Sequence, residues 1–327
     1  MLQSINEVRH HHVDAFGTRI HVAELGEGPM VLFVHGFPEL WYSWRHQLPV
    51  VAQAGYRAVA IDVRGYGSSA SPAGVDDYRM LCHVADNVGV VQALGEDTAI
   101  IVGHDWGAPI SWWSALLKPD VFTALGLLSV PYSPRGPVRP STAFRQMGGD
   151  EEFYIEYFQQ PGRAEAEIEG DIDGWLRGFY HSASGDAAPR SDGKTMATVA
   201  PGGQLRDRLT VPTHFGPWMT EDDFDVYLGE FRRTGLTGGL NRYRNADRDW
   251  VDLAAWHLAP ITQPALFVGG ERDGPTRWGT AAIDRFPVTL PNLYRSVVVP
   301  RAGHWVQQEA ADAVNEELLG FLSALTR

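Results

Sequence analysis

An acidic residue stands at the centre of a tight, glycine-flanked turn in this sequence. The apolar run 99–102 leads directly into Gly103-His104-Asp105-Trp106-Gly107, and a segment with helical spacing follows. This is the small-x-nucleophile-x-small pattern of a strand-turn-helix elbow, in which small residues make room for a strained central residue. Serine is the usual nucleophile there. We therefore predict that Asp105 is a nucleophile, and the alternative is an ordinary turn flanked by glycines.

A carboxylate nucleophile restricts the kind of substrate. Aspartate has an ordinary pKa of about 3.9, so it is ionised at neutral pH and can attack without a general base. A serine that attacked an sp³ carbon would form an ether, which activated water could not open. An aspartate forms an alkyl ester, whose carbonyl carbon water can attack. Asp105 therefore indicates a substrate with an electrophilic sp³ carbon.

Two further residues complete the chain order nucleophile, acid, histidine. The apolar run 265–268 is followed by Asp273, and the run 296–299 is followed by His304. Both follow predicted strands, at the sheet edge where open α/β folds place their sites. Asp273 would orient His304, and His304 would activate water. Taken singly, each could be an ordinary loop residue, but the order favours a triad with Asp105.

An oxyanion site is predicted from a second turn. His35-Gly36-Phe37-Pro38 follows the apolar run 30–34. In the elbow architecture one N–H comes from the residue after the nucleophile and another from the loop after an earlier strand. These are the backbone N–H groups of Trp106 and Phe37. A turn without this role is the alternative, and Pro38 permits a cis peptide bond.

Other motifs support neither a metal nor a cofactor. His10-His11-His12 lies in a polar segment, where adjacent histidines are usually solvated. Gly65-Tyr66-Gly67-Ser68-Ser69 lacks the third glycine of a dinucleotide fingerprint and the lysine of a P-loop. Cys82 is the only cysteine, so neither an internal disulfide nor a cysteine-based metal site can form. We predict that the protein uses no metal and no cofactor.

The elements that position these residues form an α/β pattern. Buried strands are predicted from short apolar runs at 30–34, 58–61, 99–102, 124–130, 265–268 and 296–299. A weaker hairpin precedes them at 8–14 and 19–24, and helical stripes lie at 81–91 and 314–325. Strands that alternate with helices predict a mostly parallel sheet covered on both faces. We assign residues 1–133 and 247–327 to this core.

The alternation stops between 134 and 246, which we interpret as an inserted helical cap. A stripe at 168–179 is rich in aromatic residues, and Thr220-Glu-Asp-Asp223 is a helix start signal. Residues 181–212, rich in Ser, Gly, Ala and Pro, are predicted to be an irregular loop. An apolar substrate pocket in the cap is predicted from Trp175, Phe179, Phe215, Trp218 and Met219, and packing between cap and core is the alternative.

Composition excludes several classes of function. The 327 residues include 27 basic and 40 acidic side chains, for a net charge of −13. An acidic chain without basic blocks is a poor match for nucleic acid or an anionic membrane. A hydrophobic share of 44% is sufficient for a core and excludes general disorder. With no visible signal peptide and no run of about 18 apolar residues, we expect a cytoplasmic protein.

The sequence resembles the soluble epoxide hydrolases of bacteria and plants, within the α/β-hydrolase fold superfamily. The motifs that carry the resemblance are His35-Gly-Phe-Pro-Glu-Leu-Trp-Tyr-Ser-Trp-Arg45, Asp62-Val-Arg-Gly-Tyr-Gly67, Gly103-His-Asp-Trp-Gly107, Tyr154-Ile-Glu-Tyr-Phe-Gln-Gln-Pro-Gly162, Asn241-Arg-Tyr-Arg-Asn245 and Gly303-His-Trp305. The resemblance implies the α/β-hydrolase fold with a helical cap. It also implies that two cap tyrosines bind and protonate the epoxide oxygen. Motif matching assigns these roles to Tyr154 and Tyr243, rather than to Tyr157.

Three functions remain to be compared. The first is an epoxide hydrolase, whose partners are an apolar epoxide and water and whose product is a vicinal diol. The second is a haloalkane or haloacid dehalogenase that uses the same Asp105, Asp273 and His304. A departing halide needs N–H donors rather than an acid, and Phe37 stands where many dehalogenases carry Asn. The third is a binding module on a degenerate hydrolase fold, which the intact nucleophile, acid and base disfavour.

Overall fold

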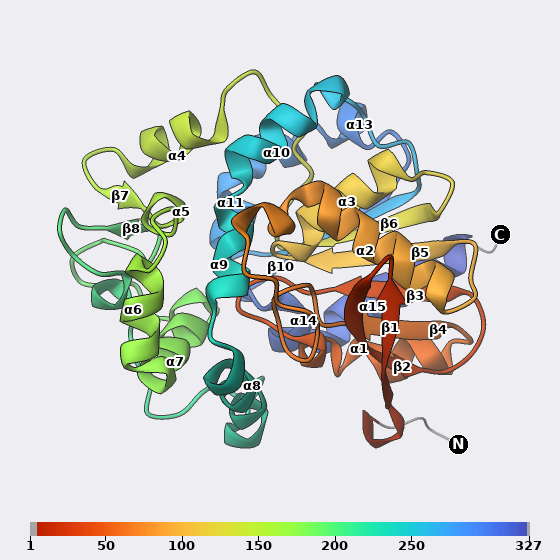
Figure 1. Ribbon diagram of the computed structural model, residues 1–327, viewed down its shortest axis with the longest axis horizontal. Coiled ribbons are helices and arrows are strands. Elements are labelled where there is room, and N and C mark those ends of the chain that lie inside the picture. The colour runs from red at the N-terminus through yellow and green to blue at the C-terminus, as the bar shows by residue number, and fades with distance from the viewer. Residues whose placement is uncertain (1–4, 326–327) are drawn as a thin grey trace.

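An eight-stranded, mostly parallel sheet forms the centre of the computed structural model, which describes residues 5–325 (Figure 1). Its strands are β1 (Arg9–Ala15), β2 (Thr18–Leu25), β3 (Met30–Val34), β4 (Arg57–Ile61), β5 (Ala99–His104), β6 (Phe122–Leu128), β9 (Ala265–Gly270) and β10 (Leu293–Val299). Their order is β1-β2-β4-β3-β5-β6-β9-β10, and only β2 runs against the other strands, being antiparallel to both β1 and β4. All the strands predicted from the sequence are present, and the α/β class is confirmed.

Helices cover both faces of the sheet. α2 (Met80–Ala93) and α3 (Gly107–Leu117) pack on one face, and α1 (Gln47–Gln53) and α15 (Ala311–Leu325) pack on the other. Every side chain of β3 is buried, as expected for a strand enclosed between two helical layers. Shorter helices connect the later strands and are α10 (Ala246–Asp252), α11 (Gly274–Trp278), α12 (Thr280–Ile283), α13 (Phe286–Thr289) and α14 (Val306–Glu309).

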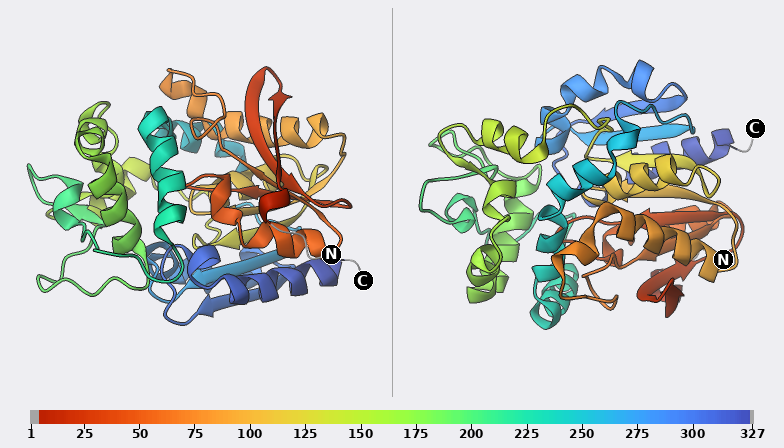
Figure 2. Two further views of the ribbon diagram at one scale, coloured as in Figure 1. Left: turned by 90° about the horizontal axis from the view of Figure 1, so that it is seen from below. Right: turned by 45° about the horizontal axis from the view of Figure 1, so that its top comes forward.

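A second group of helices lies to one side of the sheet, and both views in Figure 2 show this separation. These helices are α4 (Pro140–Gly148), α5 (Tyr154–Tyr157), α6 (Arg163–Gly170), α7 (Ile172–Ala183), α8 (Glu221–Thr234) and α9 (Thr237–Tyr243). We refer to residues 134–246 as the cap and propose these limits for it. α8 begins as predicted, because the Thr220 hydroxyl accepts from the Asp223 N–H at 3.1 Å and the Asp223 carboxylate accepts from the Thr220 N–H at 2.8 Å.

The cap differs from the sequence prediction in two places. Asp171 ends α6 and accepts from the Gly174 N–H at 3.1 Å, so the stripe at 168–179 is divided between α6 and α7. The predicted loop contains β8 (Thr198–Val199), which pairs with β7 (Glu152–Phe153). Strands of two residues are too short to produce an alternating pattern in a sequence.

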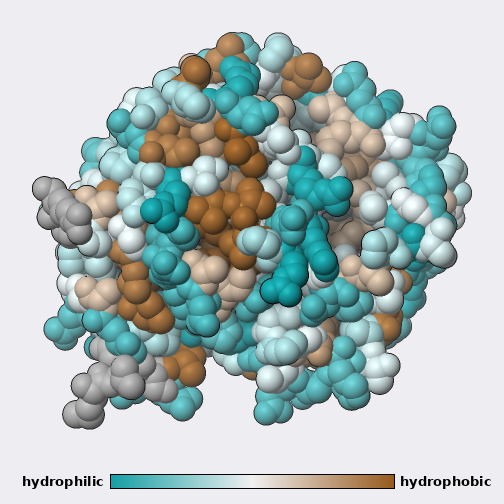
Figure 3. All heavy atoms as spheres, turned by 180° about the vertical axis from the view of Figure 1, so that it is seen from behind, coloured by the Kyte–Doolittle hydropathy of each residue, from teal (hydrophilic) through white to brown (hydrophobic). Residues whose placement is uncertain are grey.

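The core exposes large apolar side chains on an edge strand of its sheet. β10 is the last strand in the sheet order and exposes Tyr294 and Val298. Seen from behind, apolar side chains gather on the upper part of the molecule (Figure 3). Within residues 5–325, no helix combines the length and the apolar character needed to cross a membrane.

Candidate active site

The turn between β5 and α3 holds Asp105 in a conformation that side chains rarely adopt. Its φ is 49°, in the left-handed region, although it is not glycine. A Cβ on Gly103 would overlap the Gly107 carbonyl, and a Cβ on Gly107 would overlap the Val34 carbonyl. The two glycines therefore allow the close backbone approach that presents Asp105 at the carboxyl end of β5.

One oxygen of Asp105 is already bound by a backbone donor. The Phe37 N–H donates to Asp105 Oδ1 at 2.8 Å. A Cβ on Gly36 would collide with the Asp105 side chain, and the Phe37–Pro38 peptide bond is cis. This leaves Oδ2 as the oxygen that faces the rest of the cavity. The two oxygens of the carboxylate thus have different surroundings.

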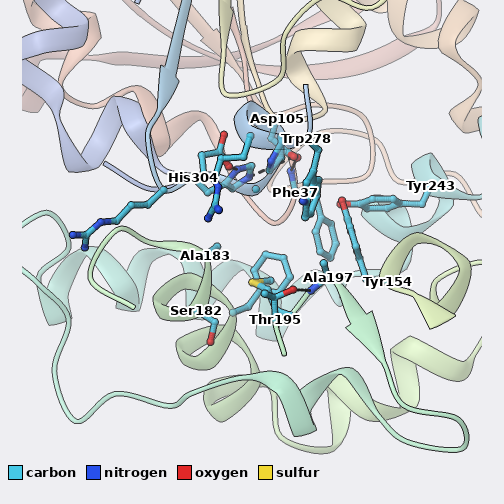
Figure 4. A pocket seen from close by; sticks show the side chains of 17 residues that line it. Phe37, Asp105, Tyr154, Ser182, Ala183, Thr195, Ala197, Tyr243, Trp278 and His304 are labelled. Atoms are coloured by element: carbon cyan, nitrogen blue, oxygen red, sulfur yellow. Dashed lines mark hydrogen bonds and ion pairs between the residues drawn. The ribbon is translucent and has the colours of Figure 1, made fainter. Parts of the chain in front are cut away.

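His304 lies between the two carboxylates that the sequence assigned to it. Its Nδ1 is 2.9 Å from Asp273 Oδ1, and its Nε2 is 3.4 Å from Asp105 Oδ2 (Figure 4). Burial alone would lower the pKa of His304, but the two carboxylates outweigh it and raise this pKa well above its usual value. In this state His304 holds its proton firmly.

Asp273 is buried and receives donors on both oxygens. Besides His304, the Ser129 hydroxyl donates to Asp273 Oδ2 at 2.6 Å, and the Thr276 hydroxyl donates to the same oxygen at 2.8 Å. Burial alone would raise the pKa of Asp273, but His304 and these hydroxyls lower it. Ser129 has a φ of 68° and follows β6 directly. Sequence analysis missed it, although its place after a strand was a usable signal.

A second buried carboxylate–imidazole pair lies beside Asp105, and sequence analysis also missed it. Glu39 Oε2 is 2.6 Å from His104 Nδ1, and His104 Nε2 is 2.7 Å from the carbonyl oxygen of His304. Both nitrogens of His104 therefore lie within hydrogen-bond distance of an oxygen. Burial would raise the pKa of Glu39, but His104, His35 and the Gly36 N–H lower it to about 2.

Glu39 also connects three segments of the site. Its Oε2 accepts from the Gly36 N–H at 2.9 Å, and its Oε1 accepts from the Gln307 side chain at 2.9 Å. Gly36 precedes the Phe37 donor, His104 precedes Asp105, and Gln307 follows His304 closely. Glu39 and His104 therefore hold together the loop that contains Phe37, the turn that contains Asp105 and the loop that contains His304.

The cap contributes two tyrosines to the same space. Tyr154 begins α5 and Tyr243 ends α9, and their rings meet edge to face at 6.1 Å. In Figure 4 both hydroxyl ends converge in front of Asp105 and Phe37. Burial, with a contribution from the Asp105 charge, raises the pKa of both tyrosines, so each retains its O–H. Tyr157 instead donates its hydroxyl to Glu167 inside the cap.

Two cavities meet at Asp105. The smaller chamber, of about 450 Å³, is the one drawn in Figure 4, and it includes His304, Tyr243, Met196 and Thr195. The larger chamber, of about 640 Å³, has a mainly apolar lining that includes Trp112, Val138, Phe144 and Met147. Four residues line both chambers: Asp105, Tyr154, Pro275 and Trp278. Trp278 was not singled out in the sequence, because it lies in the core.

Of the five residues predicted to line the pocket, Phe179 does so and the other four lie elsewhere. Trp175 stacks on Phe179 and donates its indole N–H to Glu167 at 2.8 Å. The other three pack within the cap: Phe215 contacts Phe224, Trp218 donates to Asp186, and Met219 is buried. These contacts fit the alternative role, packing. α7 turns Trp175 toward Glu167, and the other three residues lie in the irregular segment that precedes α8.

Comparisons with known proteins agree on one family. The sequence model of the α/β hydrolase fold matches residues 29–311. The chain is 43% identical to epoxide hydrolase A of Mycobacterium tuberculosis, covering 96% of this chain and 97% of that protein. It is 41% identical to epoxide hydrolase B of the same organism, covering 97% and 98%. A solved epoxide hydrolase from an endophytic Streptomyces superimposes with a TM-score of 0.95 at 60% identity, covering 98% and 96%.

Proposed function

This chain belongs to the epoxide hydrolases of the α/β hydrolase fold, and from this premise we propose that it forms a vicinal diol through a covalent ester on Asp105. Asp105 Oδ2 attacks one carbon of the epoxide ring, and the bond from that carbon to the ring oxygen breaks. The other oxygen, Oδ1, stays on the Phe37 N–H and becomes the carbonyl oxygen of the ester. The nucleophile needs no base for this step.

The departing oxygen is an alkoxide, and the cap tyrosines act on it. An alkoxide is a poor leaving group unless an acid with a pKa near 10 is at hand, as tyrosine provides. Tyr154 and Tyr243 donate to the ring oxygen before attack, and one of them transfers its proton as the bond breaks. The phenolate regains a proton before the next turnover.

Hydrolysis of the ester is the task of His304. Esterification removes the negative charge of Asp105, which is one of the two charges that raise the pKa of His304. The histidine then releases its proton more easily. This proton passes to solvent and balances the one that the phenolate takes up, and the neutral histidine can act as the base. It takes a proton from water, the hydroxide attacks the ester carbon, and the charge on Oδ1 is held by the Phe37 N–H, with Trp106 as the second donor. The bond between the ester carbon and Oδ2 then breaks, Oδ2 takes the proton that His304 received from water, and the diol leaves with this original oxygen of Asp105.

The single observation that supports this proposal best is the unequal environment of the two Asp105 oxygens. Oδ1 is 2.8 Å from the Phe37 N–H, whereas Oδ2 is 3.4 Å from His304 Nε2. One oxygen is thus prepared to become an oxyanion and the other is available to attack.

A single turnover in heavy-oxygen water tests this proposal. With enzyme in excess over styrene oxide, the first diol should carry light oxygen from Asp105, and heavy oxygen should remain in the protein. Solvent label in the first diol would instead indicate direct attack by water, and no covalent ester.

The dehalogenase alternative uses the same three residues and is disfavoured by the cap. Two neutral tyrosine hydroxyls converge on the reaction space, where a departing halide needs no proton (Figure 4). Release of chloride or bromide faster than formation of diol would favour this alternative.

A further inference from the structure

The backbone of His304 is held by the cap as well as by the core. Its N–H donates to the Ala183 carbonyl at 2.9 Å, and its carbonyl oxygen is 2.7 Å from His104 Nε2. Ala183 ends α7 in the cap, and in Figure 4 it lies beside His304. The position of the histidine therefore depends on a segment that is remote from it in the sequence.

One carboxylate, that of Glu309, accepts the peptide N–H groups on both sides of His304. Glu309 Oε2 accepts from the Gly303 N–H at 2.9 Å, and Oε1 accepts from the Trp305 N–H at 3.0 Å. Oε2 also accepts from the Gly185 N–H at 2.7 Å, which belongs to the cap. Three backbone donors from two segments thus converge on a single side chain.

The two segments approach each other too closely for a side chain to stand between them. A Cβ on Gly303 would overlap the Gly185 nitrogen, so glycine is needed at this contact. The Trp305 indole N–H adds a hydrogen bond to the Tyr180 carbonyl of α7, at 2.8 Å. The end of α7 and the loop that contains His304 are therefore joined along several residues, with Glu309 between them.

The partners of Glu309 suit it to holding backbone in place. Backbone N–H groups are its partners in all three hydrogen bonds. Burial raises the pKa of Glu309, and these N–H groups and the charge of His304 lower it only in part. If the acceptor were lost, a peptide N–H would stay enclosed without a partner, which costs more than the bond itself.

Ester hydrolysis depends on the exact place of His304. A general base has to be within hydrogen-bond reach of a water that also lies against the ester carbon. Asp273 contacts the histidine ring at Nδ1, at 2.9 Å, and so orients the ring without fixing the backbone that carries it. The attack of Asp105 on the epoxide makes no use of this base. A shift of the His304 backbone should therefore affect the second step alone.

We propose that Glu309 is a positioning residue for ester hydrolysis, which fixes the backbone on both sides of His304 and joins it to the end of α7. The inference rests on the proposed function, since it assumes an ester that His304 hydrolyses. It also gives the cap a part in the second step, although the groups that react in that step all belong to the core.

The test measures the two steps separately in Glu309→Gln. Glutamine has one carbonyl oxygen in place of two carboxylate oxygens, so it leaves an N–H group of this cluster without its acceptor. With enzyme in excess over styrene oxide, stopped-flow fluorescence follows the formation and the hydrolysis of the ester in one trace. The amplitude of the first phase counts the folded sites, so that a partly unfolded preparation does not distort the rate constants.

A second variant and a matched control accompany it. Glu309→Asp keeps the charge, but its side chain is too short to reach all three donors. Glu167→Gln is the control, because Glu167 also accepts two backbone N–H groups, from Leu205 at 3.0 Å and from Arg206 at 2.8 Å, but does so inside the cap.

We expect hydrolysis to slow on the order of 10- to 100-fold in Glu309→Gln, as for the loss of a hydrogen bond to a charged group, while ester formation keeps the parent rate. Once hydrolysis limits turnover, kcat and KM should fall together and kcat/KM should stay at the parent value. Glu309→Asp should show the same separation of the two steps to a smaller degree. Glu167→Gln should lower only the fraction of folded sites and leave both rate constants unchanged.

Three results would overturn this inference. Glu309→Gln could hydrolyse the ester at the parent rate, both steps could slow by the same factor, or Glu167→Gln could separate the two steps equally well. If Glu309→Gln yields no folded protein, Glu309→Asp decides by the same criteria. If the parent forms no ester with styrene oxide, the proposed function itself fails.

Discussion

The two sides of the reaction space hold their reactive groups in different ways. On the core side, Asp273 and His304 are held by charge and by several short hydrogen bonds. On the cap side, Tyr154 and Tyr243 are held mainly by rings, since Tyr243 meets Phe37, Trp106 and Phe158 edge to face at 5.1–5.3 Å. Charge and hydrogen bonds therefore position the residues on the core side, whereas the packing of aromatic rings positions those on the cap side.

In the mechanism proposed above, this difference separates the two chemical steps. The cap tyrosines would act on the epoxide oxygen, which is present only while the ester forms. His304 and Asp273 would act on water, which is needed only while the ester is hydrolysed. A substitution on one side should therefore slow one step and leave the other intact.

The largest effect is expected on the core side. His304→Gln removes the base while Asp105 can still attack, so turnover should fall on the order of 10⁴-fold or more, with accumulation of ester. Mass spectrometry after mixing with styrene oxide should show the protein plus the mass of the epoxide. Normal turnover by an unmodified variant would remove His304 from the mechanism.

The complementary change on the cap side should prevent the ester from forming. Each single variant, Tyr154→Phe or Tyr243→Phe, should lose activity moderately, because the second hydroxyl compensates in part. The double variant should lose on the order of 10³-fold in the rate of ester formation, as for the loss of a donor to a developing oxyanion. Stopped-flow fluorescence of the ester burst measures this rate, and an unchanged circular dichroism spectrum is the folding control. Epoxide opening at the parent rate would favour the dehalogenase.

Glu39→Gln should reveal how far the core side depends on charge. The pKa of Glu39 is lowered from 4.5 to about 2, so ionised Glu39 stabilises the fold at pH values above its unfolded pKa. A shift of this size corresponds to about 3 kcal/mol. We expect the free energy of unfolding at pH 7 to fall by about that amount, and the difference from the parent to shrink as pH falls from 4.5 toward 2. Urea titrations at several pH values measure it, and a difference independent of pH would contradict it.

The smallest expected effect is that of Ser129→Ala, and it concerns positioning. Loss of one donor to Asp273 should slow ester hydrolysis about tenfold or less, with ester formation unchanged. Because this hydroxyl helps to lower the pKa of Asp273, the acidic limb of the hydrolysis rate should move to higher pH. A uniform slowing of both steps would indicate a structural role only.

The sequence was most informative where backbone geometry dictates residue type. The elbow needs Gly103 and Gly107 on steric grounds, so Asp105 could be located from its flanking residues. The strand ends that bring Asp273 and His304 together were visible as apolar runs. Tyr154 and Tyr243 came from resemblance rather than from spacing.

Other residues of the site could not be predicted from a pattern in the sequence. Glu39 and His104 are polar residues in the interior, and only the fold shows that they meet. Among the predicted pocket residues of the cap, Trp175 depends on how α7 is rotated, and it turns toward Glu167 instead of the cavity. Phe215, Trp218 and Met219 lie in an irregular segment before α8, whose path has no periodic pattern to predict it. Rotation about a helix axis is decided by packing between helices, which a single amphipathic stripe does not specify.

The meeting of two chambers at Asp105 also bears on how substrate enters and product leaves the enzyme. Met147 in the lining of the larger chamber is 47% exposed, and Arg277 in the lining of the smaller one is also exposed, so each chamber reaches solvent on its own side. Such a passage allows a diol to depart by one end while the next epoxide waits at the other. We therefore expect that exchange of diol for epoxide does not require the cap to open at each turnover.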